Sequence, residues 1–289
     1  MPNAVEPPSE SPTTLAEALA LMADGSGSAW RPIAGGTDLM VQLTGEIGEP
    51  PERIIDIWSL DELRGITVDG ASLEIGALTT YTELRRSPVV AELVPALVDA
   101  AATIGAAQIQ NRGTLGGNVV NGSPAGDTLP VLLALDATMV LASASGAREV
   151  AAGDFWPSYR TTARRDDELL VRIRIPVIPD RTIRFRKVGT RRAQAISKVV
   201  MALAWRGSAG GDWSDVRLAL GSVAATTVRA PATETALEGQ RPTRDVADTA
   251  VAALTTELEP IDDVRSTAAY RRAVAGRVLH RMLRDEGGW

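Results

Sequence analysis

The sequence of 289 residues predicts an α+β fold, and three observations lead to this class. Segments with strand-like alternation and segments with helical spacing both occur, but they do not alternate regularly as in a doubly wound parallel sheet. Strand-like segments are frequent through the middle of the chain, whereas helix-like segments take over from about residue 232. A pair of prolines, Pro176 and Pro179, interrupts the pattern and marks the best candidate for a domain boundary.

The first predicted elements form a small mixed region. A helix is predicted over residues 13–23, because Leu15, Leu19 and Met22 recur at helical spacing behind a threonine N-cap. The segment WRPIAGGTDLM follows, and its short apolar strand leads into a glycine turn. The β-branched run RIIDIW, residues 53–58, predicts another strand.

The next part of the chain combines a hairpin with helices. Residues 65–78, GITVDGASLEIGAL, alternate around an Asp-Gly pair, which predicts a β-hairpin. Pro88 opens a single long helix rich in Ala, Val and Leu, predicted to continue to about Ile104. Residues 128–137 predict a buried helix that leads into the strand TMVLAS.

Strands flank the proline pair on both sides. Residues 168–176, ELLVRIRIP, alternate apolar side chains with arginines and predict a strand that ends at the prolines. Beyond them, further strands are predicted in the segments TIRFRKVG, SKVVMALAWRG and DVRLALGSVA. Helices follow, and the last of them is predicted at residues 267–285.

Composition excludes several classes of function. The net charge of −6 opposes general binding to nucleic acid or to an anionic membrane, and no apolar run approaches the roughly 18 residues of a membrane span. Without cysteine, the chain cannot hold a cysteine-bound iron–sulfur cluster. The single histidine, His280, is expected at a helix surface and has no partners for a nucleophile triad or a metal site. Since no secretory signal precedes the first helix, we expect a cytoplasmic protein whose chemistry depends on a cofactor.

Two glycine-rich stretches are candidates for a ligand site: IAGGTDL at residues 33–39 and GTLGGN at residues 113–118. Glycine lets backbone N–H groups turn inward together and lets a ligand approach the main chain closely. Two such turns facing each other would suit a pyrophosphate, although a Gly-Gly pair alone is more often only a turn. Neither stretch matches a Rossmann fingerprint or a P-loop.

The stretches IAGGTDLM and TLGGNVVNGSPAGDTLPVLLALDA together resemble the FAD-binding medium subunit of the molybdenum hydroxylases, the family of xanthine dehydrogenase and carbon monoxide dehydrogenase. The resemblance extends over nearly the whole chain, including ELLVRIRIP, FRKVGTRRAQAISKV and the last helix. It implies a two-lobed FAD-binding domain of the PCMH type, similar to vanillyl-alcohol oxidase, with lobes at residues 1–58 and 59–177. It also implies a small C-terminal α+β domain at residues 181–289, made of a three-stranded sheet and helices, and the proline boundary agrees with this division.

The resemblance implies that both glycine stretches bind the FAD pyrophosphate and neighbouring atoms, largely through backbone N–H groups. The residues concerned are Ile33, Ala34, Gly35, Gly36, Thr37, Asp38, Leu39, Thr114, Gly116, Gly117 and Asn118. Ile104, Leu169 and Lys187 are implied to contact the flavin, with a solvated lysine as the alternative for Lys187. Asp127 is implied to contact the cofactor, where an ionised carboxylate would accept hydrogen bonds from a ribityl or ribose hydroxyl. No residue is assigned a catalytic or metal-binding role.

By the same resemblance, the chain is expected to be an electron-transfer subunit of a heterotrimer. Substrate would be hydroxylated at a molybdenum cofactor on a large chain, and electrons would reach this FAD through two 2Fe-2S clusters on a small chain. A dimer of heterotrimers is expected, with an N-heterocycle or purine as substrate and carbon monoxide or an aldehyde as alternatives. The terminal acceptor stays open between NAD, oxygen and quinone. A self-contained flavin oxidase or reductase of the same superfold is the rival hypothesis, but it would need an acid or base beside the flavin, and none is evident.

Overall fold

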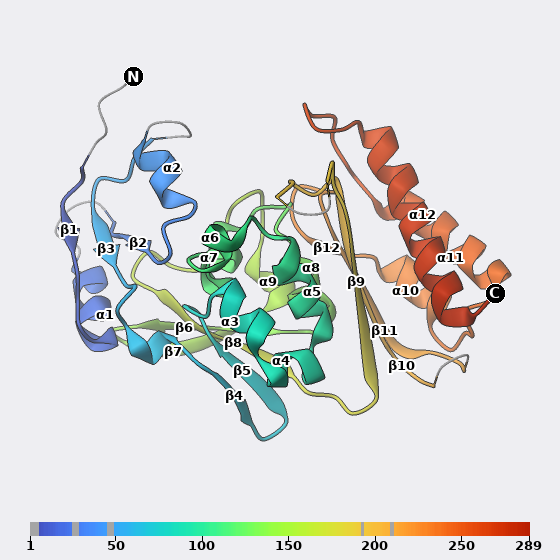
Figure 1. Ribbon diagram of the computed structural model, residues 1–289, viewed down its shortest axis with the longest axis horizontal. Coiled ribbons are helices and arrows are strands. Elements are labelled where there is room, and N and C mark those ends of the chain that lie inside the picture. Colours follow the sequence, from blue (N-terminus) through green and yellow to red (C-terminus); the bar gives the residue numbers. More distant parts are fainter. Residues whose placement is uncertain (1–5, 25–28, 45–48, 192–193, 209–210) are drawn as a thin grey trace.

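Three β-sheets follow one another along the chain and along the long axis of the molecule (Figure 1). The computed structural model describes residues 6–24, 29–44, 49–191, 194–208 and 211–289, so the predicted first lobe begins outside the described residues. Helices pack on the sheets without a regular β-α alternation. The α+β prediction is confirmed.

The first sheet is small and parallel. Strand β3 lies in the centre and pairs in parallel with β1 on one side and β2 on the other. Thr14 is the N-cap of the first helix, where its side chain accepts a hydrogen bond from the amide of Glu17, as the threonine N-cap prediction requires. The elements are β1 (Ser9–Glu10), α1 (Leu15–Ala23), β2 (Arg31–Ile33), α2 (Leu39–Leu43) and β3 (Ile54–Asp56).

The second sheet has five strands in the order β4-β5-β8-β6-β7, and every neighbouring pair is antiparallel. The predicted hairpin is present, and Gly70 has the positive φ of 56° that its tight loop requires. The elements are η1 (Asp61–Leu63), β4 (Ile66–Asp69), β5 (Ser72–Gly76), α3 (Tyr81–Arg86), α4 (Pro88–Leu93), α5 (Pro95–Thr103), α6 (Ala107–Gln110), α7 (Leu115–Asn121), α8 (Leu129–Ala134), β6 (Thr138–Ser143), β7 (Gly146–Ala151), α9 (Ala152–Phe155) and β8 (Leu169–Pro176).

The single long helix predicted from Pro88 to Ile104 is wrong. The segment forms two helices, α4 and α5, which are separated at Val94, where φ is −140° and ψ is 62°. Pro95 is the reason, because proline disfavours the helical conformation at the residue before it and begins a helix readily at its own position. The break lets α5 turn toward the third sheet, where it contacts β9.

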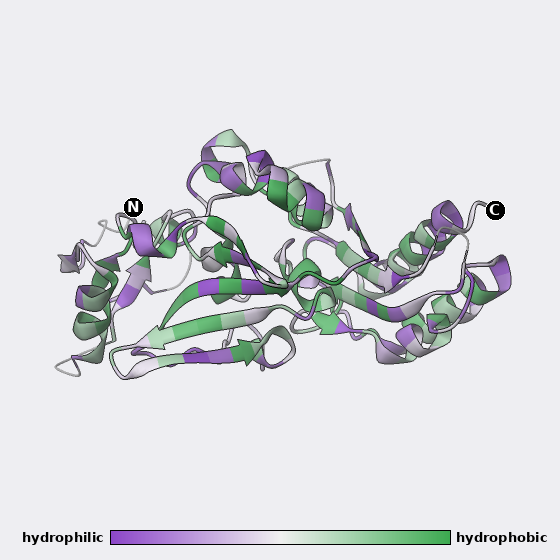
Figure 2. Cartoon of the chain, turned by 90° about the horizontal axis from the view of Figure 1, so that it is seen from below, coloured by the Kyte–Doolittle hydropathy of each residue, from purple (hydrophilic) through white to green (hydrophobic). Residues whose placement is uncertain are grey.

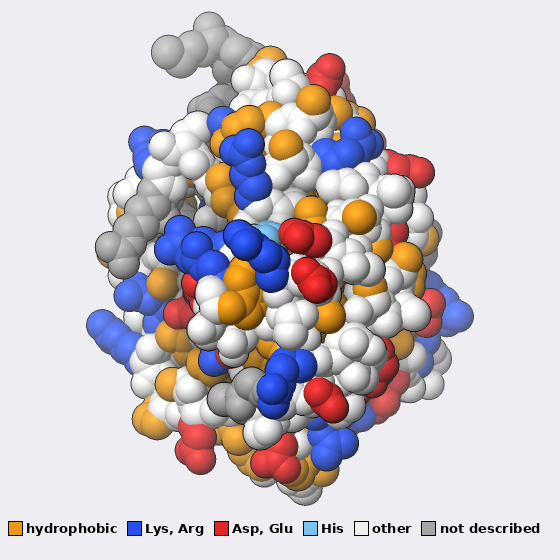
Figure 3. All heavy atoms as spheres, turned by 90° about the vertical axis from the view of Figure 1, so that its right-hand side faces the viewer, with side chains coloured by type: hydrophobic (Ala, Val, Ile, Leu, Met, Phe, Trp, Pro, Cys, Tyr) orange, Lys and Arg blue, Asp and Glu red, His pale blue; other side chains and the backbone are white. Residues whose placement is uncertain are grey.

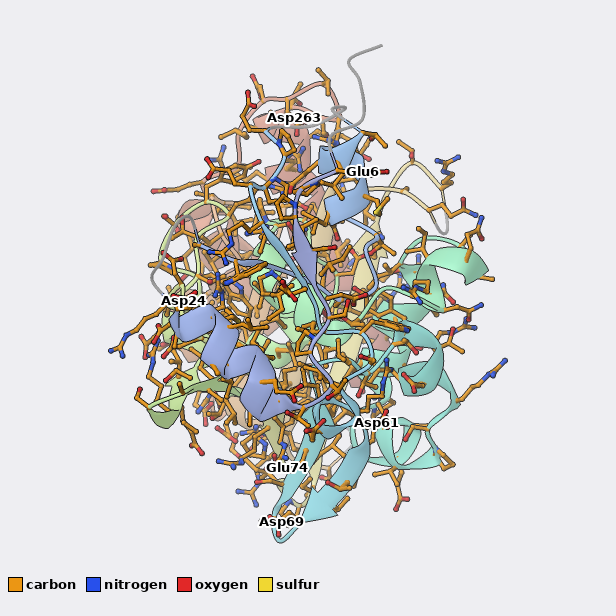
Figure 4. All side chains as sticks on the ribbon, turned by 90° about the vertical axis from the view of Figure 1, so that its left-hand side faces the viewer. Glu6, Asp24, Asp61, Asp69, Glu74 and Asp263 are labelled. Atoms are coloured by element: carbon orange, nitrogen blue, oxygen red, sulfur yellow. The ribbon has the colours of Figure 1, made fainter. Side chains whose placement is uncertain are left out.

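Arginines on β8 point away from the core and are neutralised by glutamates. Glu74 on β5 (Figure 4) is only 5% exposed, and its carboxylate lies near Arg172 and Arg174 of the neighbouring strand. On the other face of β8, Ile173 and Ile175 are fully buried. The predicted alternation is therefore confirmed, with ion pairs on a polar face where the side chain of Arg172 is half exposed.

The third sheet is covered on both faces, and all residues of its strand β10 except Arg206 are buried. Figure 2 shows hydrophobic and hydrophilic residues side by side along several strands of the molecule. Alternate residues of β10 face opposite sides: Ala202 packs toward the second lobe, whereas Leu203 and Trp205 pack toward the C-terminal helices. A short fourth strand, β12, joins the three predicted ones. The elements are β9 (Arg181–Val188), β10 (Val199–Arg206), β11 (Ser214–Gly221), β12 (Val228–Arg229), α10 (Pro231–Leu237), α11 (Arg244–Glu257) and α12 (Ala268–Gly287).

An ionic cluster joins the second lobe to the third sheet. Asp136, in the turn between α8 and β6, lies within 4 Å of guanidinium groups of Arg181, Arg217 and Arg229. Asp215 adds a second carboxylate to the same cluster. These pairs, together with the shared apolar core, fix the two parts against each other. None of the helices among the described residues is both long and apolar enough to span a membrane.

Candidate functional site

A cavity lies between the first sheet and the helices packed on the second sheet, and we call it the first cavity. The turn after β2 forms one wall, and the start of α7 together with Leu169 and Leu170 at the start of β8 forms the other. The predicted residues that line it are Ile33, Ala34, Gly35, Gly36, Thr37, Asp38, Leu39, Thr114, Gly116, Gly117, Asn118 and Leu169. The fold therefore brings the two glycine stretches together in the lining of one cavity, where Gly35 packs against the backbone of Arg112 and Gly113.

The turn from Ala34 to Asp38 presents free backbone donors. Within the described part of the chain, none of the five amide groups in this turn donates a hydrogen bond. Gly36 has a φ of +76°, which reverses the chain, and a side chain on Gly35 would collide with the carbonyl oxygen of Arg112 at 1.7 Å. Consecutive unbonded amides make a concavity that suits an anion, so this turn fits a pyrophosphate.

The second glycine stretch differs from the prediction. It is the first turn of α7, with Thr114 as N-cap, and its amides already have protein acceptors. The amide of Gly116 donates to the carbonyl of Ala77 at 2.9 Å, and the amide of Gly117 donates to Oγ1 of Thr114 at 3.0 Å. The expectation that both stretches bind through free N–H groups is therefore wrong for this one, because the N-cap Thr114 and the carbonyl of Ala77 already accept from those donors.

The two glycines of α7 serve different purposes. A Cβ on Gly116 would lie 2.6 Å from the carbonyl oxygen of Ala77, so Gly116 allows α7 to pack closely on the end of β5. A Cβ on Gly117 would meet only Oγ1 of Thr114, at 2.9 Å, and Gly117 is exposed on the cavity wall. Gly117 thus keeps the wall bare for a ligand, whereas Gly116 serves the fold.

Two arginines that sequence reasoning missed also line the first cavity. Arg31 precedes the glycine turn, and Arg164 lies in the loop before β8. Arg164 donates to the carbonyl oxygens of Arg165 and Glu168, and burial, together with the nearby Arg31, holds its pKa below the usual value. Two guanidinium groups near the free amides make this cavity favourable for an anion. The only sequence signal for Arg31 is its position two residues before the glycine stretch.

A second cavity of about 640 Å³ opens between the second lobe and the C-terminal domain. Such a volume falls within the ~300–1,000 Å³ typical of ligand pockets. Ile104, Asp127 and Lys187, the remaining predicted residues, line this second cavity. Both cavities share residues of the first glycine turn, α3 and α7, so they adjoin, and we call the two together the groove; the shared residues are Thr37, Asp38, Tyr81, Asn118 and Asn121.

Asp127 and Lys187 form a buried ion pair in the second cavity. Nζ of Lys187 donates to Oδ2 of Asp127, and the two side chains are only 6% and 7% exposed. The alternative of a solvated Lys187 is therefore wrong. Burial raises the pKa of the Asp127 carboxyl, while Lys187 and the hydroxyl of Thr103 oppose that rise. Oδ1 of Asp127 has no hydrogen-bond partner among the described residues, so it is available to accept from a ligand hydroxyl.

Polar groups at the junction of the cavities connect three segments. The side-chain Nδ2 of Asn121 donates to Oδ1 of Asp38 at 3.2 Å, and Arg160 donates to the side-chain Oδ1 of Asn121 at 2.9 Å. This chain ties the first glycine turn to the end of α7 and to the loop after α9. Sequence reasoning did not assign Asn121 or Arg160, which carry no motif of their own.

His280 lies away from both cavities. It faces a shallow groove between α11 and α12, and its Nε2 is 3.4 Å from Oδ1 of Asp248. Figure 3 shows this histidine on a surface where basic and acidic side chains lie side by side. Among the described residues, no group of three or more His, Asp or Glu side chains is arranged to hold a metal ion.

Comparison with known proteins agrees with this geometry. Residues 6–178 match the family described as the FAD binding domain in molybdopterin dehydrogenase, and residues 184–285 match the CO dehydrogenase flavoprotein C-terminal domain. The chain belongs to the FAD-binding medium subunits of the molybdopterin dehydrogenases. It is thus a flavoprotein subunit of molybdenum-dependent dehydrogenases, as the sequence motifs predicted.

Individual members of the family match between three quarters and nearly all of this chain. The carbon monoxide dehydrogenase medium chain of Hydrogenophaga pseudoflava is 33% identical over 272 residues, which span 94% of each chain. The xanthine dehydrogenase FAD-binding subunit of Escherichia coli O157:H7 is 36% identical and covers 75% of this chain and 74% of its own. The solved structure of quinoline 2-oxidoreductase from Pseudomonas putida 86 superposes with a TM-score of 0.91 at 28% identity, covering 99% and 98% of the two chains.

Proposed function

We propose that this medium subunit binds one FAD across the groove formed by the adjoining first and second cavities. The observation that carries the proposal is the run of unbonded amides at Ala34–Asp38 in one cavity, together with the unpartnered Oδ1 of Asp127 in the other. Free N–H groups suit the pyrophosphate, and a carboxylate oxygen suits a ribityl or ribose hydroxyl. The Asp127 and Lys187 pair would then lie toward the flavin, with Ile104 beside it.

The residues fit a role in holding and shielding the cofactor. Arg31 and Arg164 add positive charge near the amides, and Gly117 leaves room on the opposite wall. Bound FAD supplies a redox centre that accepts electrons singly and passes them on in pairs. Burial and the ion pair hold the side chains of Lys187 and Asp127 in one orientation.

We further propose that the chain works in a complex with an iron–sulfur small subunit and a molybdenum-cofactor large subunit, assembled as a dimer of heterotrimers. Two 2Fe-2S clusters on the small subunit would deliver electrons to the FAD, because this chain has no cysteine to hold them. The substrate would be an N-heterocycle or purine, in line with the relatives named for xanthine and quinoline. Carbon monoxide and an aldehyde are the alternative substrates, since other relatives are named for carbon monoxide and glyceraldehyde.

The purified chain tests the cofactor assignment. We expect flavin absorption bands, and complete release of the flavin by acid or heat, because the chain has no cysteine and His280 lies outside both cavities. Mass spectrometry of the released flavin should give FAD and not FMN. Flavin that stays attached to the peptide, or purification without flavin and without FAD binding, would contradict the proposal.

Activity measurements test whether this chain only transfers electrons while another subunit hydroxylates the substrate. We expect the isolated chain to transfer electrons from an artificial or nicotinamide donor to a dye, and to hydroxylate no substrate. In the co-expressed complex, removal of FAD should stop transfer to the terminal acceptor, while substrate still reduces the iron–sulfur clusters. Substrate turnover by this chain alone, with FAD as its sole cofactor, would instead establish a self-contained flavin oxidase or reductase.

A further inference from the structure

Tyr81 occupies the junction of the two cavities. It is the first residue of α3, which a capping box between Thr80 and Glu83 starts directly after the strand end at Gly76. Tyr81 lines both cavities although it is only 4% exposed. A ligand that extends from one cavity into the other must therefore pass this side chain.

The ring of Tyr81 is held in place by backbone. Its amide donates to the carbonyl of Gly113 at 3.2 Å, and a Cβ on Gly113 would lie 2.8 Å from the ring. The hydroxyl, in contrast, makes no hydrogen bond to any described residue, and it is not among the fully enclosed atoms that lack a partner, so it is open to the cavities. A buried tyrosine normally satisfies its hydroxyl, so an open partner position at the edge of a cavity indicates that a ligand completes it.

The protonation state of Tyr81 makes it a donor. Burial raises the pKa of the phenol, and the carboxylates of Asp38 and Asp127 raise it further. The hydroxyl therefore remains neutral throughout the ordinary pH range. Asp38 also borders both cavities, and its carboxylate would repel an anionic ligand oxygen unless donors stand between them.

We propose that the Tyr81 hydroxyl donates a hydrogen bond to the bound FAD where it crosses between the cavities, to an oxygen of its ribityl–pyrophosphate part. This inference rests on the proposed function. Tyr81 is then a cofactor-binding residue that stands outside both glycine stretches. The sequence offers one signal for it, the capping box that fixes Tyr81 at the start of a helix beside the groove.

The test replaces the hydroxyl alone. Apo-protein of the full chain is titrated with FAD, and binding is followed by flavin fluorescence. Loss of one net hydrogen bond predicts that Tyr81→Phe raises the Kd roughly three- to tenfold. Tyr270→Phe is the matched control, because this substitution removes the same hydroxyl group from a tyrosine that lies on α12, outside both cavities. Its Kd should equal that of the wild type.

Thermal unfolding of the apo-proteins separates binding from folding. Tyr81→Phe keeps the ring, so its apo-protein should unfold near the wild-type temperature. An unchanged Kd in Tyr81→Phe, with wild-type protein that binds FAD, would overturn the role of Tyr81 and leave the proposed function standing. A wild-type chain that binds no FAD would overturn both. Equal weakening in Tyr81→Phe and Tyr270→Phe would also overturn the role of Tyr81.

Discussion

Gly117→Val is expected to weaken FAD binding by roughly ten- to a hundredfold or more, with only a small loss of stability. The new side chain would project from the wall of the first cavity, where it meets Oγ1 of Thr114 and otherwise the space assigned to the ligand. Filling a close-fitting site with extra carbon atoms costs about 1–3 kcal/mol. Valine is also a better helix residue than glycine, so α7 itself should tolerate the change.

Two other glycines provide the contrast for this experiment. Gly153→Val lies on α9, with no atom within 4 Å of the added Cβ, and it should leave FAD binding unchanged. Gly116→Val should lower the unfolding temperature of the apo-protein strongly, because its side chain meets the carbonyl of Ala77. The readouts are the flavin-to-protein absorbance ratio and the thermal unfolding of each variant. Full flavin content in Gly117→Val would show that the cofactor does not approach this wall.

The sequence predicts the glycine stretches as a site but not what each glycine does. The sequence does not distinguish Gly116 from Gly117. Only Gly116 packs against Ala77, and this contact exists only in the folded chain. Unbonded amides predicted for both stretches occur only in the first. Thr114 before Leu115 is an N-cap signal, but the sequence Thr-Leu-Gly-Gly is equally typical of a turn. Only the structure shows that the helix α7 continues beyond the glycines.

Long-range pairing explains the other misses. Strands with clear alternation, such as β8, are predictable because apolar and polar residues alternate along the sequence itself. The pairing of Asp127 with Lys187 joins residues from different domains, and the alternating pattern around Lys187 equally suits a solvated side chain. Tyr81 and Arg164 line the cavities because of the neighbours that the fold brings to them, so their residue types alone do not predict a role in the site.

Asp127 consequently matters more than a single polar contact. Considered alone, its carboxylate would be expected to contribute about 0.5–1.5 kcal/mol to cofactor binding through one hydrogen bond. The structure adds that Asp127 balances the buried charge of Lys187. Removal of either partner leaves the other charge in the protein interior, where it is costly. Breaking this ion pair is therefore expected to affect the stability of the protein more than its FAD binding. A substitution of Lys187 shows the effect on stability most clearly.

Lys187→Met is expected to lower the free energy of unfolding by about 3–5 kcal/mol at neutral pH, because the carboxylate of Asp127 stays buried without its counter-ion. Methionine retains the length and the apolar stem of lysine, so packing changes little. Adding Asp127→Asn should recover most of the loss, since the double variant has no buried charge. Urea unfolding of the apo-proteins measures the free energy of all four members of this double-mutant cycle.

The pH dependence identifies the cause of the loss. Burial already raises the pKa of Asp127 above its ordinary 3.8, and Lys187 is the main group that opposes this rise. A carboxyl whose pKa is raised by folding binds its proton more tightly in the folded state, so stability is highest below the ordinary pKa and falls as pH increases. The gap between Lys187→Met and wild type should therefore be smallest near pH 4 and widen toward neutral pH. In the double variant the gap should stay constant, and a constant gap in the single variant would show that lost packing, not the buried charge, destabilises it.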